Sequence, residues 1–85
     1  MNKSLQSYLD AIAPLIVKSA LCSNPLIVDI TNNSRQVARG FIFVAVRGAK
    51  SDGHAFIHAA VAAGAVAVVC SDPERFVPGV NCVAV

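Results

Sequence analysis

The fold is decided by residues 40–70, which read GFIFVAVRGAKSDGHAFIHAAVAAGAVAVVC. An apolar run at Phe41–Val46 is followed by a loop at Gly48–Gly53. Apolar residues at helical spacing then predict a helix from about His54 to Ala63, which Ser51 or Asp52 can cap and Gly64 can end. A second apolar run, Ala65–Cys70, comes next. Strand, helix and strand in this order predict a βαβ unit, in which the two strands are parallel and the crossover is right-handed.

The flanking residues extend this unit on both sides. Apolar residues at helical spacing follow a possible capping residue, Ser4: Leu5, Tyr8, Leu9 and Ile12. They predict an N-terminal helix, which Pro14 interrupts. β-branched and apolar residues predict two more strands, Leu26–Thr31 and Val80–Val85, whereas residues 15–22 are ambiguous. We therefore expect an α/β fold with a small, mostly parallel sheet of about four to five strands, flanked by helices.

Length and composition exclude several classes of protein and of partner. The 85 residues suffice for one domain, and 55% hydrophobic against 14% charged residues excludes intrinsic disorder. The longest uncharged apolar run, residues 59–70, is shorter than the roughly 18–20 residues that a membrane-spanning helix needs. A net charge of +2 is too small to indicate nucleic-acid binding. We expect neither a membrane nor a nucleic acid as partner.

The cysteines indicate the compartment. Cys22, Cys70 and Cys82 are odd in number, and the last two stand in apolar runs, where reduced cysteine packs as a small hydrophobe. Residues 19–22, SALC, have a faint similarity to a lipid-attachment site, but polar and charged residues interrupt the apolar stretch that an export signal requires. We expect free thiols in a reducing cytoplasm.

Two loops are candidates for a ligand site. Residues 32–34 and 48–53 each follow an expected strand, and the second loop leads into the expected helix. Ligands of open α/β sheets bind at such strand ends, and exposed N–H groups at a helix start favour anions. Most of the cationic residues also lie in this part of the chain: Arg35, Arg39, Arg47 and Lys50. From the pattern alone, loops that only connect strands remain an equal alternative.

Two other motifs are incomplete. The spacing of Gly48 and Gly53 resembles a P-loop, but His54 and Ala55 stand where that loop needs Lys and Ser or Thr. His54 and His58 are four residues apart, as metal ligands on a helix often are. Because no Glu follows His54 and no third ligand lies nearby in sequence, we expect no metal site and place both histidines at the surface or at a helix end.

Four segments carry a family resemblance: Thr31–Val37 (TNNSRQV), Gly40–Gly48 (GFIFVAVRG), Ser51–Ile57 (SDGHAFI) and Gly64–Val69 (GAVAVV). Together they are similar to the N-terminal domain of Mur ligases, whose pattern is D-S-R-x-V-x-x-G-x-[IL]-F-V-A-[IV]-x-G-x-x-x-D-G-H-x-F-I-x-x-A-x-x-x-G-A-x-A-V-V, with the same spacing. The D-G-H-x-F-I form resembles the E type more than the F type. One departure is Asn33, where the family usually has Asp.

The resemblance implies a role in bacterial peptidoglycan synthesis. The E-type ligase joins meso-diaminopimelate or L-lysine to UDP-N-acetylmuramoyl-L-alanyl-D-glutamate, and its three domains share the work. The central domain holds ATP and Mg²⁺, and the C-terminal domain holds the diamino acid. We expect residues 1–85 to be the single first domain, which holds the UDP end. It would bind no cofactor or metal, contain no catalytic residue and be inactive alone.

The resemblance also implies which residues meet the nucleotide: Asn32, Ser34, Ala49, Lys50 and Ser51. Asn32 and Ser34 would hydrogen-bond the uracil or ribose, and the backbone of residues 49–51 would meet neighbouring polar groups. Lys50 or Arg47 would offset the charge of the diphosphate. Two alternatives stay open at this point, an F-type ligase and a non-catalytic nucleotide-binding or interaction module.

Overall fold

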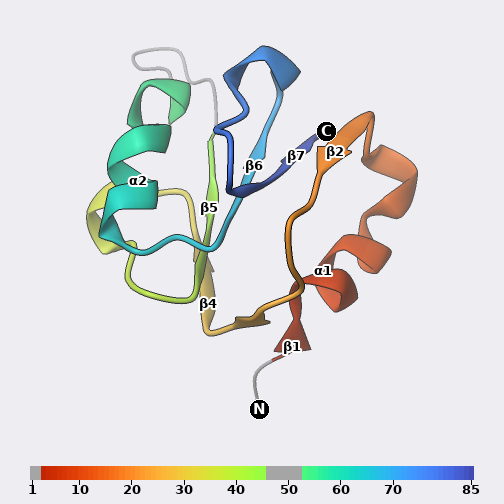
Figure 1. The fold of residues 1–85 in the computed structure, drawn as a ribbon, viewed down its shortest axis with the longest axis horizontal. Coiled ribbons are helices and arrows are strands. Elements are labelled where there is room, and N and C mark those ends of the chain that lie inside the picture. The colour runs from red at the N-terminus through yellow and green to blue at the C-terminus, as the bar shows by residue number, and fades with distance from the viewer. Residues whose placement is uncertain (1–2, 46–52) are drawn as a thin grey trace.

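The computed structural model describes residues 3–45 and 53–85, and its centre is a five-stranded sheet of order β2-β7-β6-β5-β4 (Figure 1). The strands are β2 (Lys18–Ala20), β4 (Asp29–Thr31), β5 (Phe41–Val44), β6 (Ala67–Cys70) and β7 (Asn81–Ala84). Strands β4, β5, β6 and β7 are parallel to one another, and β2 pairs with β7 in the antiparallel direction. The expected α/β fold with a small, mostly parallel sheet is confirmed.

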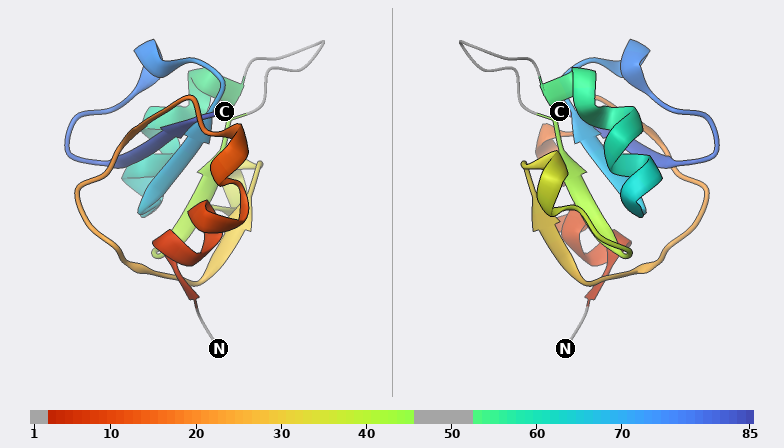
Figure 2. Two further views of the ribbon diagram at one scale, coloured as in Figure 1. Left: turned by 90° about the vertical axis from the view of Figure 1, so that its right-hand side faces the viewer. Right: turned by 90° about the vertical axis from the view of Figure 1, so that its left-hand side faces the viewer.

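Helices flank the sheet on both sides. The α-helices are α1 (Leu5–Ala11) and α2 (Ile57–Ala63), and the 3₁₀ turns are η1 (Ala13–Leu15), η2 (Ser34–Gln36), η3 (Gly53–Phe56) and η4 (Pro73–Arg75). A separate two-stranded sheet pairs β1 (Lys3–Ser4) with β3 (Leu26–Ile27). Figure 2 shows the two faces of the sheet, with α1 in front of it in the left view and α2 in front of it in the right view. Within the described ranges, no helix has the length and apolar character needed to span a membrane.

Helix α1 forms as its sequence predicts. The hydroxyl oxygen of Ser4 accepts a hydrogen bond from the Ser7 N–H at 3.4 Å and caps the helix. Leu5 and Leu9 are buried against one face of the sheet, in a cluster that includes Ile42. The chain then turns into η1, which starts at Ala13 with Pro14 near its beginning, where a missing backbone N–H does no harm.

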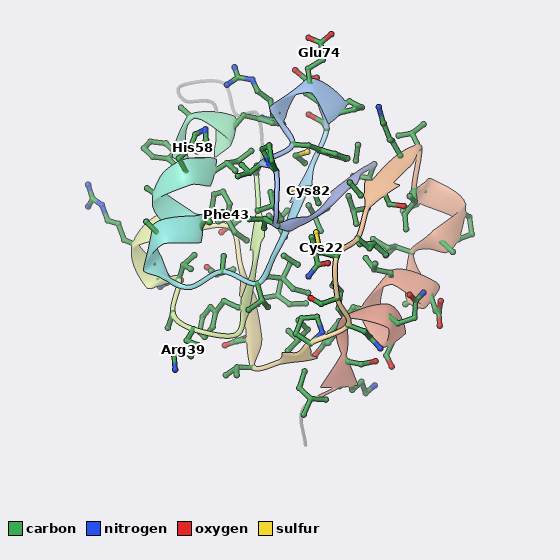
Figure 3. All side chains as sticks on the ribbon, in the orientation of Figure 1. Cys22, Arg39, Phe43, His58, Glu74 and Cys82 are labelled. Carbon is green, nitrogen blue, oxygen red and sulfur yellow. The ribbon has the colours of Figure 1, made fainter. Side chains whose placement is uncertain are left out.

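The predicted βαβ unit is present as β5, α2 and β6. Phe43 of β5 lies opposite Val68 of β6 in the register and packs against Ile57 and Ala60 of α2 (Figure 3). The preceding residue, Ile42, points to the α1 side and is 2% exposed. The central strand is therefore covered on both faces, which explains why its sequence is apolar without alternation.

The segment predicted as one strand, Leu26–Thr31, is divided in two, and that prediction was wrong at Val28. Leu26–Ile27 belongs to the small sheet, and only Asp29–Thr31 joins the main one. Between them, the N–H of Val28 donates to the Gly40 carbonyl at 2.9 Å. The backbone of Gly40 comes so close that a Cβ there would lie 2.7 Å from Val28 Cγ2, which fixes the crossing point.

Other boundaries also differ from the predictions. The helix expected from His54 begins with the 3₁₀ turn η3, and α2 proper starts at Ile57, since 3₁₀ turns are common at helix N-termini. The residues expected to cap it, Ser51 and Asp52, lie outside the described residues. The ambiguous residues 15–22 contain the edge strand β2, which pairs with β7 although its three side chains are exposed.

Candidate functional site

The first candidate loop is held by its own side chains. Asn33 Oδ1 accepts the Arg35 N–H at 3.0 Å and so caps η2. The Asn33 N–H donates to Thr31 Oγ1 at 3.0 Å, and that hydroxyl donates to Gln36 Oε1 at 3.1 Å. Three side chains are thus engaged in shaping a tight turn directly after β4. The turn is ordered without help from a ligand, which is the preorganisation that a binding loop needs.

Asn32 and Ser34 remain available on this fixed turn. Asn32 is exposed and Ser34 is partly exposed. Neither side chain takes part in a hydrogen bond with any other residue among 3–45 and 53–85. An amide and a hydroxyl both donate and accept, so the pair can match a ring or sugar that carries both kinds of group. Sequence reasoning named these two residues, and the structure brings them together.

Asn33 occupies the position where the family pattern has Asp. Its Oδ1 makes the capping hydrogen bond that a carboxylate would make, at 3.0 Å to the Arg35 N–H. The substitution therefore keeps the local geometry and removes one negative charge from the loop. An anionic ligand is repelled less as a result, so the departure is compatible with a diphosphate nearby.

The second candidate loop falls outside the described residues. Ala49, Lys50 and Ser51 all belong to residues 46–52, as does Arg47, so their assignment stays a prediction. What the structure describes are the two ends between which this loop must run. One is Ala45, which follows β5 and is buried, and the other is Gly53, where η3 begins.

His54 is buried, which the sequence did not reveal. It stands at a helix end, one of the two places expected for it, and is 2% exposed. Its Nε2 accepts the backbone N–H of Ser71 at 3.1 Å, and the Ser71 hydroxyl oxygen lies 3.2 Å from the same nitrogen. His58, by contrast, is exposed on α2 (Figure 3). The described part of the chain contains no group of three residues suited to a metal ion.

The buried thiols are not suited to nucleophilic chemistry. Burial raises the pKa of the Cys70 thiol and of the Cys82 thiol, and a backbone hydrogen bond, at Asp72 and at Val77 respectively, opposes the rise in part. A thiol needs to ionise before it attacks, so both groups are held in their inert form. Cys22 is exposed, and all three cysteines are free, as predicted.

An apolar groove of about 200 Å³ lies on the α1 side of the sheet. Its lining comes from α1 and from β4, β5 and β6: Tyr8, Leu9, Ile12, Ile30, Ile42, Val44 and Val69. Asn32 and Ser34 do not line it, although Ile30 directly precedes Thr31 at the end of β4. The groove has almost no polar surface and so offers nothing that would orient a nucleotide.

Comparison with known proteins decides the family. The family model described as "Mur ligase family, catalytic domain" matches residues 26–83, more than half of the chain. The chain belongs to the Mur ligase family. The matched region of this Mur ligase chain includes the fixed turn after β4, the βαβ unit and His54.

Two curated relatives illustrate the similarity. The UDP-N-acetylmuramoyl-L-alanyl-D-glutamate–2,6-diaminopimelate ligase of Bacteroides thetaiotaomicron is 40% identical over 82 residues, which cover 95% of this chain and 17% of that protein. The enzyme of the same name from Parabacteroides distasonis is 49% identical over 55 residues, or 61% of this chain and 11% of that protein. This Mur ligase chain thus spans less than a fifth of either relative. The names agree with the E-type resemblance.

Solved structures of Mur ligases share the fold. The MurF ligase of Thermotoga maritima in complex with ADP is 35% identical, with a TM-score of 0.60 over 67% of this chain and 13% of that one. MurF of Acinetobacter baumannii has a TM-score of 0.79 over 99% of this chain and 18% of that one. At 22% identity, the second likeness shows the fold alone.

Proposed function

We propose that this chain binds the UDP end of UDP-N-acetylmuramoyl-L-alanyl-D-glutamate, as the first domain of an ATP-dependent ligase of peptidoglycan synthesis. One observation carries the proposal. On the turn after β4, Thr31, Asn33 and Gln36 are engaged with one another, whereas Asn32 and Ser34 are left available to a ligand. These two are among the residues on which the family resemblance places nucleotide contacts, with Ala49, Lys50 and Ser51.

The contribution of such a domain to catalysis is positional. Binding a nucleotide far from the reacting carboxyl group supplies affinity and holds that carboxyl group in a fixed orientation. Asn32 and Ser34 would orient the uracil or ribose. Lys50 would offset the charge of the diphosphate, and the backbone of Ala49 and Ser51 would contact neighbouring polar groups. The sequence contains no G-x-x-G-K-[ST] motif, so ATP and Mg²⁺ belong to another domain of the proposed ligase. The chain alone should neither hydrolyse ATP nor form a peptide bond.

The added residue would be a diamino acid. The names of both curated relatives favour 2,6-diaminopimelate over lysine, and the pocket that selects it would lie outside this domain. An F-type ligase is the second candidate, because an F-type structure is 35% identical over 67% of the chain. An assay of the complete protein with 2,6-diaminopimelate and with D-alanyl-D-alanine, each with ATP and the matching UDP-muramoyl peptide, separates the two.

A binding experiment with single variants tests the proposal itself. Asn32→Ala and Ser34→Ala should each weaken UDP binding about five- to tenfold, the effect of losing one hydrogen bond to a ligand. The control variants Asn24→Ala and Ser19→Ala remove one asparagine and one serine side chain at exposed positions away from this turn, and they should leave the affinity for UDP unchanged. If all four variants bind UDP as the wild type does, the turn after β4 is not the nucleotide site.

A further inference from the structure

We infer that His54 is a positioning residue for the proposed nucleotide site, acting through α2. This inference rests on the proposed function. His54 precedes α2 in the turn η3 and is almost completely buried. Its Nε2 accepts the Ser71 N–H at 3.1 Å. The contact joins two segments that are 17 residues apart, the start of α2 and the turn after β6.

The other end of α2 is fixed independently. Gly64 closes the helix in the left-handed conformation, with φ +118°, and its carbonyl accepts the N–H of Gly40 at 3.2 Å. With only seven residues, α2 behaves as a short rigid rod between these two attachments. Removing the attachment at His54 would weaken the hold on the start of the helix, where the packing of Ile57 and Ala60 in the core would remain, and would let the helix tilt.

The tilt of α2 matters because η2 packs against it. Val37, which follows η2, is buried in the same cluster as Ile57 and Ala60 of α2. The turn η2 carries Ser34 at its first position, and Asn32 lies two residues before it. The contacts between His54 and Ser71 thus help to hold the helix against which η2, the turn of the proposed site, packs.

The turn that receives the hydrogen bond is itself well ordered. Asp72 caps η4, because its Oδ1 accepts the Glu74 N–H at 3.0 Å, and the Asp72 carbonyl accepts the Cys70 thiol at 3.3 Å. Figure 1 shows η4 and the start of α2 at the same end of the sheet, beyond the carboxyl end of β6. The hydrogen-bond partner of His54 therefore belongs to an ordered turn, and a residue that positions others needs such a fixed partner.

The test compares three variants of the chain in two measurements. His54→Met keeps a side chain of similar length but removes the nitrogen acceptor, and His54→Gln restores an acceptor oxygen near the place of Nε2. Asn81→Ala serves as the destabilised control, because Asn81 is buried at the amino end of β7, away from Ser71. The measurements are the amide NMR resonances of Ser34–Gln36 without ligand and the dissociation constant for UDP.

His54→Met should shift the η2 resonances and weaken UDP binding about tenfold, since small displacements of positioned groups have large effects. His54→Gln should restore most of the wild-type η2 resonances and of the UDP affinity. Asn81→Ala should change neither the resonances nor the affinity. If His54→Met does not fold, Ser71→Pro replaces it in both measurements, because proline at this exposed position lacks the backbone N–H that donates to His54. Identical behaviour of His54→Met and Asn81→Ala would overturn the inference. If the wild-type chain does not bind UDP, the proposed function fails, and the η2 resonances alone decide the role of His54.

Discussion

The side-chain oxygen of Asn81 accepts a hydrogen bond from the backbone N–H of Cys22 at 2.7 Å, although the two residues are 59 positions apart. The same oxygen accepts the Ser23 N–H at 3.0 Å. The Asn81 amide nitrogen donates to Ser23 Oγ at 3.1 Å and to the Val66 carbonyl at 2.9 Å. All four hydrogen-bonding positions of this buried amide are occupied. One side chain thus fastens the connection between β2 and β3 to the amino end of the parallel sheet.

Asn81→Ala should lower the free energy of unfolding by about 2–3 kcal/mol, because the backbone groups of Cys22, Ser23 and Val66 lose their part-buried hydrogen bonds to this side chain. Urea denaturation followed by circular dichroism measures the change. The matched control is Asn24→Ala, which removes one exposed hydrogen bond to the Gln6 N–H and should lower it by less than about 1 kcal/mol. An equal loss of free energy of unfolding in the two variants would contradict the larger stabilisation that we expect from the hydrogen bonds of Asn81.

Gly64→Ala should destabilise the chain more than Gly79→Ala does. Both glycines have positive φ, +118° and +83°, which disfavours any side chain by about 1–2 kcal/mol. A Cβ at Gly64 would also lie 2.7 Å from the Arg39 Cα, whereas a Cβ at Gly79 meets nothing within 4 Å. Crowding against backbone adds about 1–3 kcal/mol. Thermal unfolding of both variants measures the difference in stability. A difference near zero would show that the Arg39 backbone moves to accommodate the added Cβ.

Only one cysteine should react quickly with a thiol reagent in the folded chain. Cys22 is exposed, whereas Cys70 and Cys82 are buried and the pKa of each buried thiol is raised by that burial. An aromatic disulfide reagent should titrate one thiol at once at neutral pH and three in denaturant without reductant. A denatured count of one would mean that a disulfide exists, and three fast thiols in the native chain would contradict the burial.

The same pKa shifts predict a loss of stability in alkali. The pKa of Cys70 and that of Cys82 are raised in the folded chain, so on unfolding these thiols ionise at their usual value of about 8.5. The unfolded chain then binds fewer protons than the folded one, and the free energy of unfolding falls as the pH rises above that value. Replacing both residues by Ala should flatten this dependence above about pH 8.5, whereas Cys22→Ala should not.

The regular part of the fold was predictable because its signals are local. The βαβ unit shows in the apolar runs on either side of the helix, and Gly64 marks the helix end by the conformation that it alone adopts easily. The division of the strand Leu26–Thr31 was not predictable from its own residues. It depends on Gly40, which approaches Val28 from another part of the chain.

The candidate site was predictable in part. The family resemblance named Asn32 and Ser34, and the structure shows why these two, and not Thr31 or Asn33, are left available. No sequence pattern revealed that His54 is buried, because its partner Ser71 lies 17 residues away and only the fold brings them together. Residues 49–51 remain a prediction from the family resemblance.

The most direct test of the account is an NMR titration of the isotope-labelled chain with UDP, with ADP as the control nucleotide. The account predicts weak binding with a dissociation constant in the millimolar range, about −4 kcal/mol, since other domains would supply most contacts. Amide shifts should gather at Asn32–Ser34 and at Ala49–Ser51 and be larger for UDP than for ADP. Equal responses to the two nucleotides, or shifts centred on His54 and His58 alone, would contradict it.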